Sequence, residues 1–290
     1  MAIKKTKLIA YPVVVISAII LTTIAIDAAD NFGRFSNSLI GRLFLVSDNE
    51  SACPAGMVLV ESPVGVFCID EFENSAGKGC PMKLPARITD TDINLFEADC
   101  KPEPVKGALP WTFISQDQAK EACAKAGKRL PTSKEWLQAA LGTPDKGSDW
   151  AGEDCNVSGN WERNPGPAGY ALNCRSGSGA YDMIGNVWEW TDGVAEAGVL
   201  DGRELPEAGF VAGVDANGLA ATTSPSADNQ PYHHDYFWIK KQGRYGIAQG
   251  GYWDNKEKAG QYSAYLVSLP TFSGSAIGFR CVRSARPSGR

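Results

Sequence analysis

Oxygen-donor side chains gather in one short stretch of the sequence, GAYDMIGNVWEWTDG, residues 179–193. Asp182, Glu189 and the carbonyls of a tight Gly-Asn turn bring hard oxygen donors together, and calcium prefers such donors. Trp188 and Trp190 flank Glu189 at strand spacing, so the two indoles share one face and the carboxylate takes the other. The stretch predicts a calcium site beside a tryptophan-rich core. The alternative is a polar turn on the same core without a metal.

The eight cysteines are an even number, which is typical of an exported protein that oxidises them in pairs. No CxxC motif occurs in the sequence, and its absence weakens both a zinc site and a thiol redox motif as interpretations. We therefore expect structural disulfides.

The N-terminus has the pattern of a membrane signal anchor. Lys4, Lys5 and Lys7 precede the uncharged run Leu8–Ile26, whose 19 residues as a helix come close to the roughly 30 Å of a bilayer's hydrocarbon core. The positive flank predicts that the chain after Asp27 lies outside the cytoplasm. We expect an anchor over residues 1–29 and a tether over 30–52. The alternative is a signal peptide that is cleaved before secretion, and a buried core helix is the weakest interpretation.

Composition and charge exclude one class of partner. The net charge of −5 and the pI near 5.2 come with no clustered basic surface, so nucleic acid is not expected to bind. The length and the 31 glycines and 17 prolines indicate one loop-rich domain after the N-terminal segment.

The elements that must position these residues have clear local signals in the first half of the domain. MVLVE and VGVFCIDEFE, separated by Ser62 and Pro63, predict a β-hairpin. Capping boxes at 115–118 (SQDQ) and 132–135 (TSKE) predict two helices, the first ending at Gly127 and the second at Gly142. After Gly142 the composition predicts mostly loop until the last strands.

Four motifs in this order, GKRLPTSKEWLQAALG, GAYDMIGNVWEW, QGGYWDN and IGFRCVR, resemble the formylglycine-generating (sulfatase-modifying factor) family, whose domain is a variant of the C-type lectin fold. The resemblance covers roughly residues 53–284. It implies an α+β, loop-rich domain over residues 53–286 with two helices and small antiparallel sheets.

The resemblance also implies metal ligands and one disulfide. The calcium ligands would be Asp182, the Gly185 and Val187 carbonyls and Glu189, with a second site at Asn156 and the Val157 carbonyl. Cys123 would pair with Cys281. For the other six cysteines, which permit 15 pairings, proximity in sequence favours Cys53 with Cys68, Cys80 with Cys100, and Cys155 with Cys174.

One departure from the family pattern bears on catalysis. The oxidase members use two cysteines shortly after the GG of the third motif to bind copper, and these positions are Asn255 and Gly260 here. An amide and a bare backbone cannot replace two thiolates, the soft ligands that Cu(I) requires. We expect no copper site and no oxidase chemistry.

The segment from residue 249 to 281 is similar in length and frame to the variable regions of target proteins of diversity-generating retroelements, which use the same lectin-like fold. We call it the variable-like segment. Its expected ligand contacts, with Trp238 as a neighbour, are Tyr252, Asp254, Asn255, Tyr262, Tyr265, Val267, Ser268, Phe272 and Ser275.

Together these features predict a membrane-anchored, surface-displayed protein that binds an unknown protein or surface ligand through this segment, on a calcium-stabilised scaffold without catalysis. The alternatives are a divergent metal-dependent oxidase of the formylglycine-generating type and a purely structural envelope protein.

Overall fold

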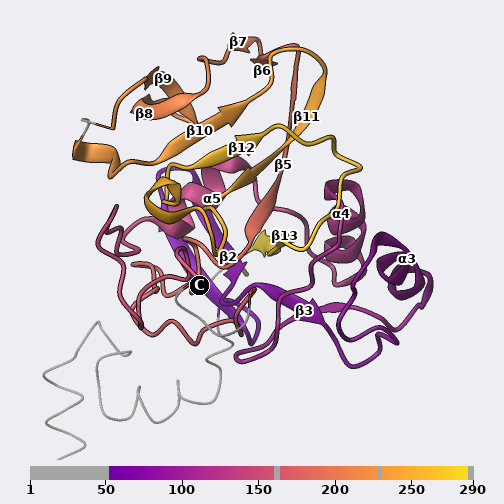
Figure 1. Cartoon of the computed structure of the whole chain (residues 1–290). Coiled ribbons are helices and arrows are strands. Elements are labelled where there is room, and N and C mark those ends of the chain that lie inside the picture. Colours follow the sequence, from indigo (N-terminus) through magenta and orange to yellow (C-terminus); the bar gives the residue numbers. More distant parts are fainter. Residues whose placement is uncertain (1–51, 160–163, 228–229, 287–290) are drawn as a thin grey trace, which may run out of the picture. The chain divides into compact units, whose positions relative to one another are not determined.

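The computed structural model describes residues 52–159, 164–227 and 230–286, and Figure 1 shows the arrangement of their elements. Within these residues the chain forms three α-helices and three sheets. The anchor expected over residues 1–29 lies outside the described residues, as does the tether expected over 30–52 except for its last residue. In the part that the structure describes, no helix has the length and apolar character that a membrane span requires.

The predicted hairpin is confirmed. β1 (Met57–Ser62) and β2 (Gly65–Asp70) pair antiparallel in continuous register from Met57 opposite Asp70 to Ser62 opposite Gly65. The C-terminal strand β14 (Val282–Ser284) pairs with the other edge of β2. This small sheet therefore brings the two ends of the domain together.

Both predicted capping boxes are present. Ser115 caps α4 (Gln116–Lys125) and Thr132 caps α5 (Ser133–Ala140), each with the reciprocal bond from the third helical residue. A further helix, α3 (Ile88–Phe96), was not expected from the sequence. Its first flanking residue, Arg87, forms no side-chain cap, so the usual start signal is missing.

The loop expected after Gly142 is present in the described residues as far as Val187, but the expectation of small antiparallel sheets was wrong. A nine-stranded sheet holds the strands in the order β7-β6-β5-β11-β12-β10-β8-β9, with β13 paired to β5. It is mixed, because β10 with β12 and β13 with β5 run parallel. Its strands are β5 (Trp188–Glu196), β6 (Val199–Leu200), β7 (Arg203–Glu204), β8 (Gly209–Val214), β9 (Ala220–Ser224), β10 (Tyr236–Ile239), β11 (Arg244–Gln249), β12 (Ala264–Leu266) and β13 (Ile277–Phe279).

Short elements complete the fold. β3 (Asn74–Ala76) pairs with β4 (Pro102–Pro104), and two single-turn 3₁₀ helices lie at Gln230–Tyr232 and Lys256–Lys258. Trp188 and Trp190 of β5 are both buried in the largest hydrophobic cluster, and Glu189 between them is buried on the opposite face. The alternation predicted for these three residues is confirmed.

All eight cysteines form disulfides, in the pairs expected from the sequence. These are Cys53–Cys68, Cys80–Cys100, Cys123–Cys281 and Cys155–Cys174. The Cys123–Cys281 bond spans 158 residues and joins α4 to the end of the variable-like segment. Four disulfides indicate an oxidising, extracytoplasmic location for the domain.

Candidate ligand-binding site

The variable-like segment is held at its two ends and in its middle. Gly250 and Gly251 both have positive φ, and a Cβ on Gly250 would lie 2.7 Å from the Met183 carbonyl oxygen. In the middle, β12 lies between β11 and β10 and pairs with both. At the end, β13 pairs with β5, with Ile277 opposite Trp188. These contacts hold the ends of the segment in place, whereas the residues between them follow no regular period.

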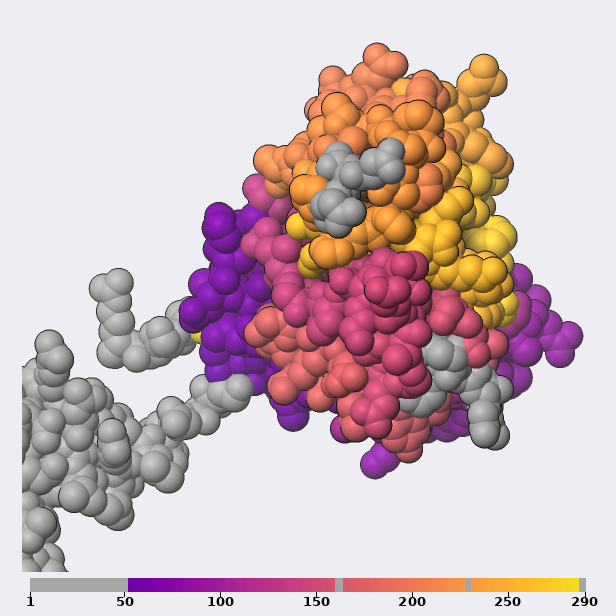
Figure 2. All heavy atoms as spheres, turned by 60° about the vertical axis from the view of Figure 1, so that its left-hand side comes forward, coloured from indigo at the N-terminus to yellow at the C-terminus, as the bar shows by residue number. Residues whose placement is uncertain are grey.

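Between these points of contact the segment reaches the surface. Figure 2 shows its yellow atoms exposed beside the orange strands of the large sheet and the magenta loops that precede residue 160. A pocket of about 440 Å³ opens here. It is lined by Trp188, Tyr252, Trp253, Tyr265, Phe272, Gly274, Ser275, Ala276 and Ile277.

Four of the predicted contact residues come together in this pocket: Tyr252, Tyr265, Phe272 and Ser275. Trp238 does not line it but packs directly behind, with its ring centroid 5.4 Å from that of Trp188. Asp254 is exposed next to the pocket. The structure thus gathers about half of the predicted set into one place.

The other predicted contacts lie differently. The Asn255 side-chain oxygen accepts a hydrogen bond from the Tyr252 backbone N–H at 2.9 Å, so Asn255 shapes the turn. Ser268 is buried, with its hydroxyl 3.2 Å from that of Tyr265. Val267 is half-buried outside the pocket lining. Tyr262 packs edge-on against Tyr232, away from the other contacts. Their roles as contacts stay predictions.

The sequence analysis missed two of the pocket's tryptophans. Trp188 was expected in the core and Trp253 was not among the expected contacts, yet both line the pocket. Trp188 lies far from the segment in sequence, and only the parallel pairing of β13 with β5 brings it there. No local signal predicts such a pairing.

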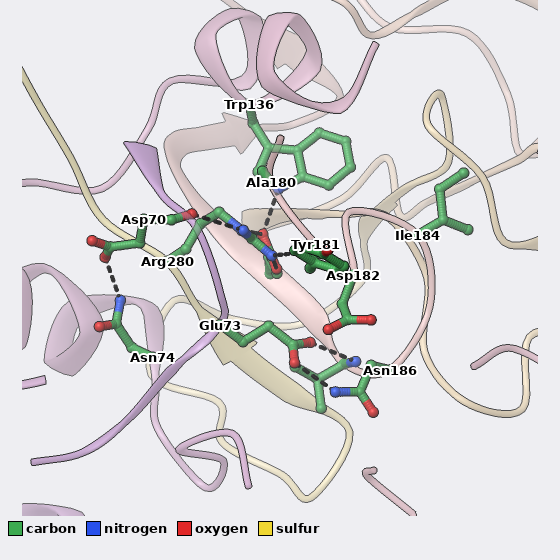
Figure 3. A network of polar contacts seen from close by, with 12 residues as sticks. Asp70, Glu73, Asn74, Trp136, Ala180, Tyr181, Asp182, Ile184, Asn186 and Arg280 are labelled. Atoms are coloured by element: carbon green, nitrogen blue, oxygen red, sulfur yellow. Dashed lines mark hydrogen bonds and ion pairs between the residues drawn. The ribbon is translucent and has the colours of Figure 1, made fainter. Parts of the chain in front are cut away.

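A buried polar network lies beneath this surface, as Figure 3 shows. The Arg280 Nε donates to Glu189 at 2.6 Å and its Nη2 donates to the other Glu189 oxygen at 2.5 Å. Arg280 also donates to the carbonyls of Asp70 and Tyr181. Trp136 Nε1 donates to Glu189 at 2.7 Å. The four bonds donated by Arg280 connect the end of the variable-like segment to the rest of the domain, and the Trp136 bond holds Glu189 in place.

Two further carboxylates share this interior. Glu73 accepts hydrogen bonds from the Asn186 side chain and the Val187 N–H. Asp182 accepts one from the Gly169 N–H at 2.6 Å. Burial, and then the negative charges of Asp182 and Glu189, raises the pKa of Glu73 well above its usual range. Burial raises the pKa of Asp182 to about 7. Three carboxyl groups therefore lie near one guanidinium, and the raised pKa values of Glu73 and Asp182 favour their protonated, neutral forms.

The expected calcium ligands are only partly free. The Glu189 oxygens already accept three hydrogen bonds, and the Val157 carbonyl accepts one from the Lys256 N–H. The buried Asn156 side-chain oxygen has no hydrogen-bond partner among the described residues. In the part of the chain that the structure describes, no group of three or more His, Cys, Asp or Glu side chains is arranged to hold a metal ion. Calcium binding stays a prediction.

A second pair of buried acids, which the sequence analysis did not foresee, lies against Gly260. A Cβ built on Gly260 would lie 1.6 Å from Asp235 Oδ1 and 2.6 Å from Asp145 Oδ2. These two oxygens therefore lie close together, next to the glycine. Neither oxygen has an N–H or O–H partner among the described residues. They form a hydrogen bond when one carboxyl keeps its proton.

This pair predicts a pH-dependent stability. Burial raises the pKa of Asp145 from its ordinary 3.8 to about 6, and burial together with the Asp145 charge raises that of Asp235 further. The pKa values of both carboxyls are raised in the folded state, so the pair's contribution to folding stability is complete below about pH 4. This contribution is lost as the pH rises through 6. We expect Asp145→Asn to raise the melting temperature at pH 7.5 by about 4–8 °C, corresponding to about 2 kcal/mol, and to flatten its pH profile between pH 5 and 7.5.

Melting curves over this pH range test the prediction. Asp149→Asn, an exposed aspartate in the same loop, is the matched control and keeps the wild-type profile. A wild-type-like profile for Asp145→Asn would show that the pair does not share a proton.

Comparisons with known proteins agree with this fold. Bovine inactive C-alpha-formylglycine-generating enzyme 2 is 32% identical over 135 residues, which are 40% of this chain and 44% of that protein. Hercynine oxygenase of Mycobacterium tuberculosis is 36% identical over 98 residues, 31% of this chain and 23% of that protein. The chain thus spans less than half the length of these curated relatives.

Solved structures match at lower identity. Major Tropism Determinant I1 Variant has 18% identity and a TM-score of 0.41, covering 80% of this chain and 53% of that one. PvdO from Pseudomonas aeruginosa has 19% identity and a TM-score of 0.40, covering 82% and 88%. The model of the sulfatase-modifying factor enzyme 1-like domain matches residues 68–285, well over half of this sequence. The chain therefore belongs to the sulfatase-modifying factor (formylglycine-generating enzyme-like) family.

Proposed function

We propose that this chain is a surface-displayed protein that binds a ligand through the variable-like segment and does not catalyse oxidation. The observation that carries the proposal is the pocket at Trp188, where four contact residues expected from the sequence meet. The segment is held by β12, β13 and the buried Arg280 network, and of the four contact residues only Tyr265 lies in one of these elements, β12. Recognition and structural support therefore use largely different side chains.

This separation suits a surface whose side chains change. Asp254, Phe272 and Ser275 are exposed, and exposed substitutions usually change the unfolding free energy by less than about 0.5 kcal/mol. Tyrosine and phenylalanine provide large contact areas with few rotatable bonds, while serine and glycine provide adaptable hydrogen bonding. The pocket combines both kinds of residue.

The environment of Gly260 supports the loss of oxidase chemistry. Asp235 lies so close to Gly260 that a cysteine side chain there would collide with its carboxylate. Asn255 uses its side-chain oxygen in a turn. The name of the bovine relative describes that protein as inactive. The divergent oxidase remains the alternative, and no contact in the pocket favours it over binding.

Phe272→Ser tests the binding proposal. Phe272 is 45% exposed at the pocket, whereas Phe96 of α3 is 89% exposed and is not among the pocket's lining residues. We expect the immobilised full chain with Phe272→Ser to retain several-fold less of the protein or surface ligand that the wild type retains. The melting temperature of the variant stays within about 2 °C of the wild-type value. Phe96→Ser retains the wild-type amount. Equal retention by all three proteins would refute the proposal.

We also propose that calcium supports the scaffold, held by Asp182, Glu189 and the carbonyls of Gly185 and Val187. The fit rests on the donor set, since three buried carboxyl groups lie around one guanidinium. A divalent cation would favour the ionised forms of these carboxyl groups. A second site at Asn156 and the Val157 carbonyl is supported only by the unpartnered Asn156 oxygen.

Asp182→Asn separates this proposal from a metal-free network. In chelator we expect the variant to melt at or above the wild-type temperature, because it removes a buried charge. Calcium at about a hundredfold excess over its dissociation constant stabilises the wild type by roughly 2.7 kcal/mol, or about 5–10 °C, and leaves the variant unchanged. Differential scanning fluorimetry measures both effects. A wild-type melting temperature that does not respond to calcium would exclude the site.

The location is proposed from the disulfides and the N-terminal sequence together. The four disulfides fit an extracytoplasmic domain. We propose that residues 1–29 anchor it to the membrane and that residues 30–52 are the tether, with secretion after cleavage as the alternative. The domain at residues 53–286 is then displayed on the cell surface.

A further inference from the structure

The pocket's walls are dominated by aromatic rings. Trp188, Tyr252, Trp253, Tyr265 and Phe272 contribute five rings to a space of about 440 Å³. The Tyr265 ring lies 5.6 Å from that of Trp188 at a tilt of 32°, and the Tyr252 ring meets that of Trp253 edge-on at 5.2 Å. The faces and edges of these rings give the pocket its character, since its remaining lining is small residues and Ile277.

No charged side chain is among the pocket's lining residues, and Asp254 directly follows the lining residue Trp253 in the sequence. The exposed carboxylate of Asp254 lies close enough to the Tyr252 phenol that, after burial, its charge is the largest effect raising the pKa of Tyr252. Aromatic faces and a carboxylate both attract cations. The pocket is therefore complementary to a positive group with flat or apolar faces.

The aromatic rings of the pocket continue into a row of rings whose far end already contacts a lysine side chain of this chain. Five rings run in continuous contact, in the order Phe210, Tyr236, Trp238, Trp188 and Tyr265. Lys258 Nζ lies 4.5 Å from the centroid of the Tyr236 ring and 5.6 Å from that of Phe210. Within the described residues, no lysine or arginine lies over the rings of Trp188, Tyr252 or Tyr265. The chain covers one end of the surface with its own cation and leaves the pocket end uncovered.

The rim indicates a protein as the source of the cation. Phe272, in the pocket lining, is 45% exposed, and Leu269, whose carbonyl accepts a hydrogen bond from the Phe272 N–H, is 53% exposed. Asp254 and Ser275 of the same segment are exposed as well. Exposed large apolar side chains around a pocket with few charges are typical of protein interfaces. Such a rim surrounds a side chain that enters from another polypeptide better than it surrounds a small free ion.

We propose that the pocket receives an arginine side chain of a protein ligand, stacked on the aromatic walls and paired with Asp254. This inference rests on the proposed function. Arginine fits better than lysine because its planar guanidinium stacks on rings, donates two parallel bonds to a carboxylate and is more weakly hydrated than an ammonium. The methylene chain of the arginine packs against the apolar parts of the rings.

Three blocked tripeptides that differ only in their central residue test the inference on the full chain in detergent. The probes are acetyl-Gly-Arg-Gly-amide, its citrulline analogue, which has the same shape without the charge, and its lysine analogue. Ligand-observed NMR gives the dissociation constants. We expect the arginine peptide to bind about tenfold more tightly than the citrulline peptide and several-fold more tightly than the lysine peptide.

Two variants test whether Asp254 causes the preference for arginine. Asp254→Asn removes most of the preference for arginine over citrulline, and Glu257→Gln, at a neighbouring acidic position whose charge is not among the causes of the raised Tyr252 pKa, leaves it unchanged. Equal binding of arginine and citrulline, equal binding of arginine and lysine, or an unchanged preference in Asp254→Asn would each overturn the inference. If none of the peptides binds while Phe272→Ser still loses the surface ligand, the arginine inference fails and the proposed function stands. If Phe272→Ser retains the ligand fully, the proposed function fails.

Discussion

Arg280→Met is expected to lower the unfolding free energy by about 4 kcal/mol at pH 7.5, a fall in melting temperature of roughly 8–16 °C. Arg280 is fully buried and donates four hydrogen bonds, two of them to Glu189. Without it, Glu189 stays buried beside Glu73 and Asp182 with no positive side chain to pair with. Breaking one side of a buried ion pair costs more than the pair itself contributes, because an uncompensated charge remains.

A double-mutant cycle distinguishes this cause from lost packing. Arg280→Met combined with Glu189→Met removes both charges, so the double variant is expected to recover part of the loss relative to Arg280→Met alone. Arg283→Lys, at a half-buried position of β14, is the control and changes the unfolding free energy by less than about 1 kcal/mol. Urea unfolding of the wild type, Arg280→Met, Glu189→Met and the double variant measures the cycle. An Arg280→Met variant within 1 kcal/mol of the wild type would show that the network does not support the segment.

Removal of the Cys123–Cys281 bond is expected to have the other large effect. Loop-closure entropy predicts about 5 kcal/mol for a loop of 158 residues, against about 3 kcal/mol for the 15-residue separation of Cys53 and Cys68. All four cysteines are buried, so replacing each pair by alanine leaves similar gaps in packing. The long bond also fixes the end of the variable-like segment to α4.

The two double alanine variants provide the comparison directly. We expect Cys123→Ala with Cys281→Ala to be about 2 kcal/mol less stable than Cys53→Ala with Cys68→Ala in denaturant unfolding. If the short-loop variant loses as much stability as the long-loop variant, the long bond does not constrain the unfolded chain as argued here.

Local signals in the sequence predicted the elements that they specify. The capping boxes at Ser115 and Thr132 predicted α4 and α5, since each box satisfies helix N–H groups within four residues. The hairpin at residues 57–70 followed from two apolar runs and a short turn. α3 was missed because Arg87 provides no side-chain cap.

Pairings between distant residues account for what the sequence did not show. The large sheet depends on contacts such as β13 with β5 and β10 with β12, which join residues far apart in the chain. For the same reason Trp188 was not expected in the pocket, and the facing acids Asp145 and Asp235 were not foreseen. Glu189 was expected beside a metal, but no local pattern indicated that Arg280 would be its partner.

Oxygen uptake by the full chain, supplied with copper(I) and a cysteine-containing peptide, is the most direct test of recognition without redox catalysis. The account predicts uptake at the level of copper alone and an unmodified peptide, because Asn255 and Gly260 provide no thiolate and Asp235 fills the space beside Gly260. Repeated turnover that converts the peptide cysteine to an aldehyde would contradict it.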